Sequence, residues 1–366
     1  MNDTNAYKKE KKNYILKRLI DISLAVIIAG GAIFAIKAVS NDFTDIDRTK
    51  ENSEESIVAT EANTPDPSAM IYVTEMADNQ SVYSGPLIVV NNQTEYKGTE
   101  ENLVSMYDIL QQDGTKDYLV MSSDVKVRAD AADALNNMVK AFATETGHKD
   151  IIVDGGYRSV SYQQELYDAA EDKSAAAQPG FSDYHTGYSV DFSISQEDGS
   201  VLDFTGAEDY AWFENNCYRY GFVLRFPDGK KELTGYDYRP WHFRYVGLSH
   251  AYYMYTNNLC LEEYVAKLKE YEYTKPHLTF TDDNGNKYET YYYPMDVTTS
   301  SSIIAVPDAE YQVSGNNTDG FIITFCLSTP AAPEETAPAS TDATAASQPA
   351  SSETVQTEAS ETLPEE

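Results

Sequence analysis

Apolar residues recur along the middle of the chain with two different spacings, and these spacings predict a mixture of helices and strands. Helical spacing runs over residues 129–146, 160–171, 208–220 and 261–270. Short apolar or alternating runs predict strands at residues 86–90, 151–154, 188–194, 222–226 and 243–246. Because the two kinds of element are mixed and many connections are short, the pattern favours an α+β fold over a regular βαβ series.

Beyond about residue 273 the pattern predicts strands alone. These strands are expected at residues 278–281, 288–293, 303–306 and 321–325. The first two flank the sequence Asp-Asp-Asn-Gly at residues 282–285, a strong signal for a β-hairpin. We therefore predict a folded domain over residues 84–273 and a small β appendage over residues 274–327.

The two ends of the chain differ from this middle part. Residues 1–18 are rich in Lys and Arg, and residues 19–39 form an apolar run that as a helix would be roughly 31 Å long, enough to cross a bilayer. The basic flank predicts that residues 1–18 are cytoplasmic, that 19–39 is a transmembrane anchor, and that the folded domain lies outside the cell membrane. A cleaved signal peptide is the alternative. Residues 40–83 form an acidic linker and residues 328–366 a tail of Pro, Ala, Ser, Thr and Glu; both are predicted to be disordered.

Charge and cysteine content exclude several classes of protein. Lys and Arg number 27 against 59 Asp and Glu, which gives a formal net charge of −32. A chain this acidic lacks the basic face that a nucleic-acid partner requires. The three cysteines, Cys217, Cys260 and Cys326, are too few for a disulfide scaffold or a zinc site made of cysteine alone.

Two stretches carry histidine beside residues suited to metal chemistry. His185 and Asp191 lie within residues 179–192, and His242 lies within residues 233–247. Imidazole and carboxylate groups from separate strands can form a hydrolytic zinc site, which usually takes three protein ligands and a water. The pattern alone does not distinguish such a site from structural histidines.

The same stretches resemble a known family. Residues 155–164 (GGYRSVSYQQ), 179–192 (PGFSDYHTGYSVDF) and 212–247, which end in YDYRPWHFRYVG, are similar to the VanY-type zinc D-alanyl-D-alanine carboxypeptidases. The similarity covers about residues 85–266. It implies a compact α+β domain with a mostly antiparallel sheet that removes the terminal D-alanine from peptidoglycan stem peptides. A stem peptide is thus the expected partner, and zinc the expected cofactor of an active member.

The resemblance assigns roles to four positions of this chain. Arg158, in the GYRS motif, takes the place of the residue that orients the substrate, and a guanidinium fork suits a carboxylate. Ser182 matches a substrate-contacting position. Asp191 and His242 match two of the zinc ligands.

Two other positions depart from the family pattern. Tyr184 occupies the place of the remaining zinc-binding His, and His185 follows one residue later. A one-residue shift in an extended chain turns a side chain to the opposite face, so His185 reaches the metal only if the loop is rearranged. Arg239 occupies the place of the general-base Glu, and a guanidinium cannot accept a proton at neutral pH.

These departures leave three hypotheses. In the first, the domain engages stem peptides with lost or much reduced hydrolysis; Tyr184 fills the volume of the lost ligand, and Arg239 pairs with Asp191. In the second, zinc is held by His185, Asp191 and His242, with Asp183 or Asp237 as the base. In the third, the β appendage carries the function as a structural or interaction module.

Overall fold

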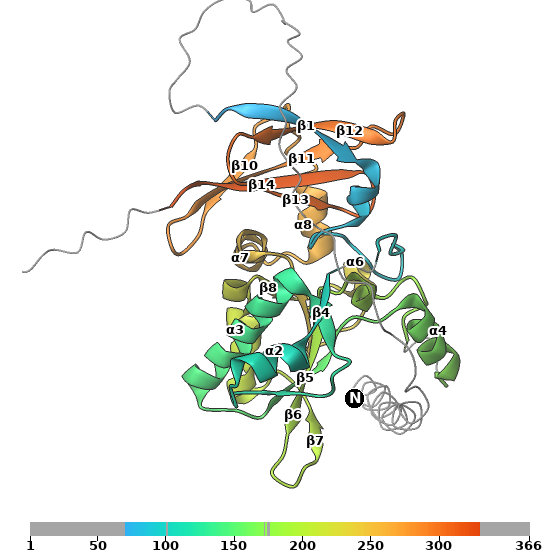
Figure 1. The fold of residues 1–366 in the computed structure, drawn as a ribbon, viewed down its shortest axis with the longest axis vertical. Helices are drawn as coiled ribbons and strands as arrows, with labels where there is room; N and C mark the ends of the chain where they lie inside the picture. Colours follow the sequence, from blue (N-terminus) through green and yellow to red (C-terminus); the bar gives the residue numbers. More distant parts are fainter. Residues whose placement is uncertain (1–69, 100–101, 172, 174–175, 330–366) are drawn as a thin grey trace, which may run out of the picture. The chain divides into compact units, whose positions relative to one another are not determined.

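The computed structural model describes residues 70–99, 102–171, 173 and 176–329 (Figure 1). The predictions of a basic cytoplasmic segment, a transmembrane anchor and a C-terminal tail, together with most of the predicted linker, fall outside these residues. Within the described ranges, no helix is both long and apolar enough to cross a membrane.

A mixed sheet forms the centre of the α+β domain. Its strands, in spatial order, are β3 (Leu119–Val120), β5 (Ile151–Gly155), β6 (Ser189–Ser195), β9 (His242–Tyr245) and β8 (Phe222–Leu224). Only β3 and β5 run parallel in this order, and β7 (Val201–Asp203) adds an antiparallel partner to β6. The predicted α+β class with a mostly antiparallel sheet is therefore confirmed.

Helix α3 (Ala129–Thr146) supplies much of the core beside this sheet. Its apolar positions at helical spacing, Leu135, Met138 and Phe142 among them, are buried. The helix ends at Gly147, whose φ of 82° is one that glycine adopts readily. The other elements of this domain are β2 (Leu103–Ser105), α2 (Met106–Asp113), β4 (Lys126–Arg128), α4 (Val160–Ala169), η3 (Asp183–Thr186), η4 (Glu208–Tyr210), α5 (Ala211–Asn216), η5 (Cys217–Tyr220), α6 (Lys231–Thr234), α7 (Leu248–Thr256) and α8 (Leu261–Leu268).

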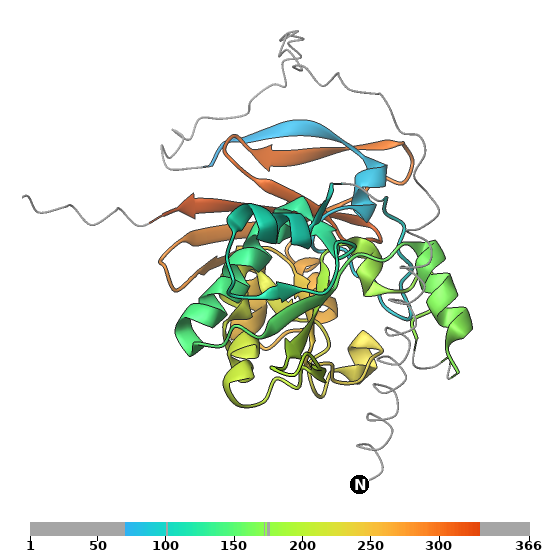
Figure 2. The same cartoon turned by 60° about the horizontal axis from the view of Figure 1, so that its bottom comes forward.

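Residues 70–84 and 272–328 together form a second part, which we call the β module. Its four-stranded sheet has the order β10 (Leu278–Thr281), β11 (Lys287–Pro294), β14 (Gly320–Ser328) and β13 (Gln312–Gly315). A two-stranded ribbon of β1 (Tyr72–Asp78) and β12 (Ser301–Pro307) lies beside it in both Figure 1 and Figure 2. The module packs on α8, because Tyr292 and Ile322 share a buried cluster with Leu261 and Leu268.

The start of the β module corrects the predicted boundary of the acidic linker. Residues 72–83, placed in that linker, form β1 and η1 (Asn79–Tyr83). The sequence of β1, YVTEMAD, does not alternate regularly between apolar and polar residues, because most of its side chains are exposed. The strand is held by backbone pairing with β12. The β appendage therefore includes an N-terminal strand, and the α+β domain is inserted between its two segments.

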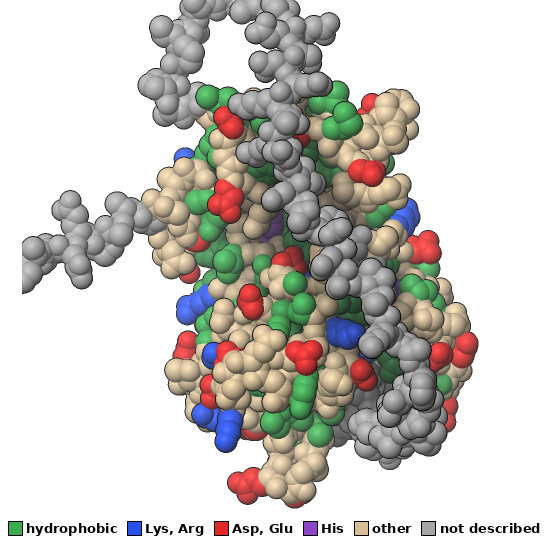
Figure 3. All heavy atoms as spheres, in the orientation of Figure 1, with side chains coloured by type: hydrophobic (Ala, Val, Ile, Leu, Met, Phe, Trp, Pro, Cys, Tyr) green, Lys and Arg blue, Asp and Glu red, His purple; other side chains and the backbone are tan. Residues whose placement is uncertain are grey.

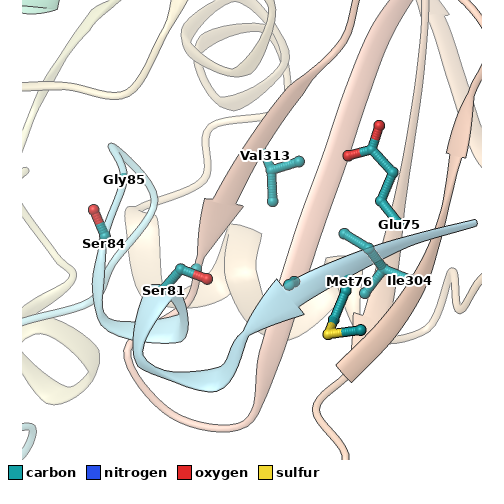
Figure 4. A pocket seen from close by; sticks show the side chains of 9 residues that line it. Glu75, Met76, Ser81, Ser84, Gly85, Ile304 and Val313 are labelled. Atoms are coloured by element: carbon teal, nitrogen blue, oxygen red, sulfur yellow. The ribbon is translucent and has the colours of Figure 1, made fainter. Parts of the chain in front are cut away.

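The β module has a pocket of its own (Figure 4). The pocket has a volume of about 260 Å³ and opens between β1, β12 and β13. Its lining residues are Glu75, Met76, Ala77, Ser81, Ser84, Gly85, Ile304, Val313 and Gly315. Acidic side chains are spread over the face of the molecule shown in Figure 3, with fewer Lys and Arg among them.

The apolar run at residues 86–90 does not form the predicted strand. Leu87, Ile88 and Val90 are buried, but their segment belongs to no sheet. Arginine side chains take the place of a partner strand. Arg244 Nη2 donates to the carbonyl of Ile88 at 2.9 Å, and Arg225 Nη2 donates to the carbonyl of Val90 at 3.2 Å. Both arginines also form ion pairs with Asp183, which belongs to the candidate site described below.

Candidate active site

Three side chains from three elements meet in a closed, hydrogen-bonded cluster. Asp191 on β6 and His242 on β9 are direct partners in the antiparallel register, so their side chains lie on the same face of the sheet. Asp191 Oδ1 lies 2.8 Å from His242 Nδ1. Tyr184, in η3, donates its hydroxyl to Asp191 Oδ2 at 2.6 Å, and that hydroxyl lies 3.1 Å from His242 Nδ1. The exposed fraction of each of the three residues is 7% or less.

A glycine makes room for the Asp191 carboxylate. Gly155, at the end of β5, is the register partner of Asp191. A Cβ atom at this glycine would lie 2.8 Å from the Asp191 Cβ and 2.9 Å from its Cγ, closer than real Cβ contacts. The second glycine of the GGYRS stretch has the same role against another strand, because a Cβ on Gly156 would lie 2.4 Å from the Lys126 carbonyl oxygen.

A buried ion-pair network around Asp183 lies next to the cluster. Asp183 Oδ1 accepts from Arg244 Nη1 at 2.5 Å and from Arg225 Nε at 3.3 Å, and Arg225 also pairs with Glu262 at 2.6 Å. Burial opposes ionisation of Asp183, but the two arginines outweigh it and hold the pKa of this carboxyl well below its usual range. The network fixes the chain segment that carries Tyr184.

His242 is thereby held between two carboxylates. Its Nε2 lies 3.3 Å from Asp183 Oδ2, while its Nδ1 faces Asp191. Carboxylate oxygens thus face both ring nitrogens of His242 and hold the ring in one orientation.

Arg158 lies against the Tyr184 ring of the cluster. Its guanidinium carbon is 3.7 Å from the centroid of the Tyr184 ring, a close cation–π contact. Its backbone N–H donates to the carbonyl of Tyr184 at 3.2 Å, which fixes the start of its side chain. Ser182, the other expected substrate contact, is buried directly before η3.

The structure does not bring His185 to Asp191 and His242. Its Nδ1 lies 2.7 Å from the carbonyl oxygen of Arg158, and its Nε2 accepts the backbone N–H of Gly180 at 3.1 Å. Burial lowers the pKa of this imidazole, in keeping with a neutral ring that donates from one nitrogen and accepts at the other. Both nitrogens are thus used by the backbone, and the loop rearrangement that would make His185 a ligand does not occur.

Arg239 does not pair with Asp191 as the sequence suggested. Its guanidinium carbon lies 4.5 Å from the Tyr236 ring centroid and 5.5 Å from that of Phe226, and it forms no ion pair within the described residues. The Phe226 ring in turn stacks on His242, with centroids 5.0 Å apart. Tyr184 and His242, rather than Arg239, hold the Asp191 carboxylate.

The residues of this cluster do not fit a zinc ion. Ligand atoms about 2.0–2.2 Å from a tetrahedral ion lie roughly 3.3–3.6 Å from one another. Here the donor atoms of Asp191 and His242 are already joined by a 2.8 Å hydrogen bond, and the Tyr184 phenol stands beside both. In the described part of the chain, no group of three or more His, Cys, Asp and Glu side chains is arranged to hold a metal.

Two features of the site escaped the sequence prediction. One is the Asp183 network, whose signal is an arginine inside each of the apolar runs FVLRF and HFRYV, at Arg225 and Arg244. A charged side chain at a buried strand position needs a buried partner of opposite charge. These two arginines therefore indicate a buried carboxylate nearby. The other is the aromatic pair of Phe226 and Tyr236, for which the sequence holds no comparable signal.

Comparison with known proteins gives consistent matches over this region. The family model for VanY, D-alanyl-D-alanine carboxypeptidase, matches residues 124–248. A D-alanyl-D-alanine carboxypeptidase of Enterococcus faecium is 33% identical over 319 residues, which are 86% of this chain and 96% of that protein. The putative carboxypeptidase YodJ of Bacillus subtilis is 39% identical over 153 residues, 39% of this chain and 55% of that protein.

One solved structure also resembles the chain at the level of the fold. It is the vancomycin resistance D,D-dipeptidase VanXYg in complex with a D-Ala-D-Ala phosphinate analogue, which matches with a TM-score of 0.60 and 27% sequence identity. The match covers 70% of this chain and 99% of that one.

Proposed function

Because the chain belongs to the VanY family of D-alanyl-D-alanine carboxypeptidases, we propose that its α+β domain binds the carboxyl end of peptidoglycan stem peptides, with hydrolysis lost or much reduced. The observation that carries this proposal is the closed contact of Tyr184, Asp191 and His242. It occupies the place where a hydrolytic member of the family would hold its metal. The direct hydrogen bonds there leave no open coordination position for an ion or its water.

The absence of a proton acceptor supports the same conclusion. Metal-assisted hydrolysis needs a base that takes a proton from water, and a guanidinium such as that of Arg239 is not a proton acceptor at neutral pH. The nearby acids are otherwise engaged. Asp183 is held by two arginines, and Asp237 is an exposed partner of Lys231 at 2.8 Å. Asp183 contacts the cluster through His242 Nε2, at 3.3 Å, and its charge is already paired with Arg244 and Arg225, which argues against it as the base of the rearranged-site hypothesis.

The ability to bind a peptide carboxylate is retained. Arg158 is half-buried, its guanidinium carbon lies 3.7 Å from the centroid of the Tyr184 ring, and a guanidinium fork matches the planar fork of a carboxylate. Tyr184 has a second role here, because its ring is the surface on which Arg158 lies. The substitution that closes the metal position therefore also orients the binding arginine.

We further propose that residues 19–39 anchor the protein in the cell membrane and that the α+β domain lies outside, where stem peptides occur. The apolar length of this segment and the basic residues before it support this placement.

The experiment that tests the proposal measures binding and cleavage on the same sample. The purified full chain is titrated with a synthetic stem pentapeptide ending in D-Ala-D-Ala, with and without added zinc, and free D-alanine is quantified. The proposal predicts saturable binding without D-alanine release above a chelator-treated control. Zinc-stimulated release would contradict it, and so would the absence of binding.

A further inference from the structure

Arg158 and Arg239 are connected through a series of contacts between aromatic rings. Arg158 contacts Tyr184, whose ring lies 4.7 Å from that of His242. His242 stacks on Phe226, and Phe226 is contacted by Arg239. A single carboxylate has one fork of two oxygens, so it can be the bidentate ligand of only one guanidinium. Two guanidiniums that each lie against an aromatic ring can therefore each take an anion of their own.

The backbone around Arg239 is fixed, so its side chain starts from a defined point. Its own N–H donates to the carbonyl of Phe226 at 3.1 Å, and its carbonyl accepts from the N–H of His242 at 3.1 Å. The guanidinium lies over Tyr236 and is half-buried. A guanidinium that lies on an aromatic face keeps its in-plane N–H groups available, and it loses less freedom on binding than a mobile side chain does.

No carboxylate of its own loop neutralises Arg239. The neighbouring Asp237 pairs with Lys231, and Tyr238 directs its hydroxyl to Glu214 at 3.3 Å. Within the described residues Arg239 forms no ion pair, although the chain carries a net charge of −32. The Arg239 guanidinium is thus a positive charge that lies on an aromatic ring and has no acidic partner in the described part of the chain. Such a group can bind an anion even in a protein that is acidic as a whole.

We infer that Arg239 is a specificity-determining residue that binds a second carboxylate of the peptide, in addition to the terminal carboxylate bound by Arg158. This inference rests on the proposed function and deepens it. The preferred ligand class is a stem peptide that bears a free carboxylate on a residue before its D-Ala-D-Ala end. The same peptide with that group as a primary amide is the weaker ligand.

The test compares two peptides of equal length that end in D-Ala-D-Ala and differ only in that internal group, carboxylate or amide. Binding to the full chain is measured by isothermal titration calorimetry at fixed ionic strength. Wild type is expected to prefer the dicarboxylate roughly tenfold, the effect of one charge-assisted contact at a half-exposed site. Arg239→Gln is expected to remove this preference, and Arg239→Lys to retain part of it.

Two further variants make the outcomes distinct. Arg158→Gln is expected to weaken both peptides while leaving their ratio unchanged. Lys140→Gln, which removes a partly exposed cation that pairs with Asp113, is expected to change neither affinity by more than about twofold. The inference is overturned if wild type binds the two peptides with equal affinity. It is also overturned if Arg239→Gln, with unchanged thermal stability, still prefers the dicarboxylate peptide as wild type does. Either result leaves the proposed function standing. Failure of wild type to bind either peptide overturns both the proposed function and the inference.

Discussion

Replacement of Tyr184 by Phe removes one hydroxyl from the buried cluster and keeps the ring. The Asp191 carboxylate then loses a donor at 2.6 Å in a place where only 1% of that residue is exposed. Hydrogen bonds to charged groups contribute about 1.5–3 kcal/mol, and an acceptor left without its donor in the interior accounts for much of that loss. We expect Tyr184→Phe to lower the free energy of unfolding by about 2 kcal/mol.

The effect is measurable as a shift of the thermal unfolding midpoint. For a domain of this size, about 1 kcal/mol corresponds to roughly 2–4 °C, so the expected decrease is about 4–8 °C. Tyr311→Phe is a matched control, because its hydroxyl also donates to a carboxylate at 2.6 Å, that of Glu75, but at an exposed position. That change is expected to cost less than about 0.5 kcal/mol.

The reasoning is refuted if the two variants lose equal stability, or if added zinc raises the midpoint of Tyr184→Phe. The first result would mean that the cluster does not depend on the phenol. The second would mean that the hydroxyl had been excluding a metal which the remaining residues can hold.

Three further predictions concern other parts of the structure. Arg244→Met removes one of the two cations that hold a buried carboxylate, and is expected to cost about 3–5 kcal/mol in chemical denaturation; a loss below about 1 kcal/mol would show that the network is dispensable. Gly155→Ala places a methyl group against Asp191 and is expected to lower both the unfolding midpoint and the affinity for stem peptides, whereas wild-type binding by this variant would contradict the close packing. In the β module, burial lowers the pKa of His277, but its hydrogen bonds to Glu289 and to a backbone carbonyl raise it above 6.5 overall; hydrogen bonding to His277 likewise lowers the pKa of Glu289 below 4.5 despite burial. The stabilisation from His277 is therefore complete below pH 6.5 and lost as pH rises through its raised pKa, while that from Glu289 is complete above pH 4.5 and lost as pH falls through its lowered pKa. A stability profile of His277→Gln that parallels wild type from pH 4 to 9 would contradict this assignment.

Some regular elements in both parts of the protein follow from local patterns. The helix over residues 129–146 in the α+β domain and the hairpin around residues 282–285 in the β module are as predicted, since each depends on periodicity or turn chemistry within a short segment. Residues 86–90 were predicted as a strand and are not one. The sequence shows that the segment is apolar, but not that distant arginine side chains satisfy its carbonyl groups.

The candidate site was predictable only in part, for a related reason. The resemblance to a family marked Tyr184, Asp191, His242 and Arg239, but residue types do not specify which charge meets which partner. Asp191 has two candidate partners at similar chain separation, Arg239 and His242, and the register of β6 and β9 places His242 beside it. Arg239 instead contacts the rings of Phe226 and Tyr236, and no local sequence pattern predicts these contacts.

The most direct test of the closed cluster is the zinc content of the purified full chain. It is measured by inductively coupled plasma mass spectrometry after equilibration with zinc and removal of the unbound ion. The variant Tyr184→His/Arg239→Glu, which restores the family residues, serves as the comparison. The wild-type chain is expected to hold far less than one zinc per molecule and the variant about one. A wild-type content near one zinc per chain would contradict the account.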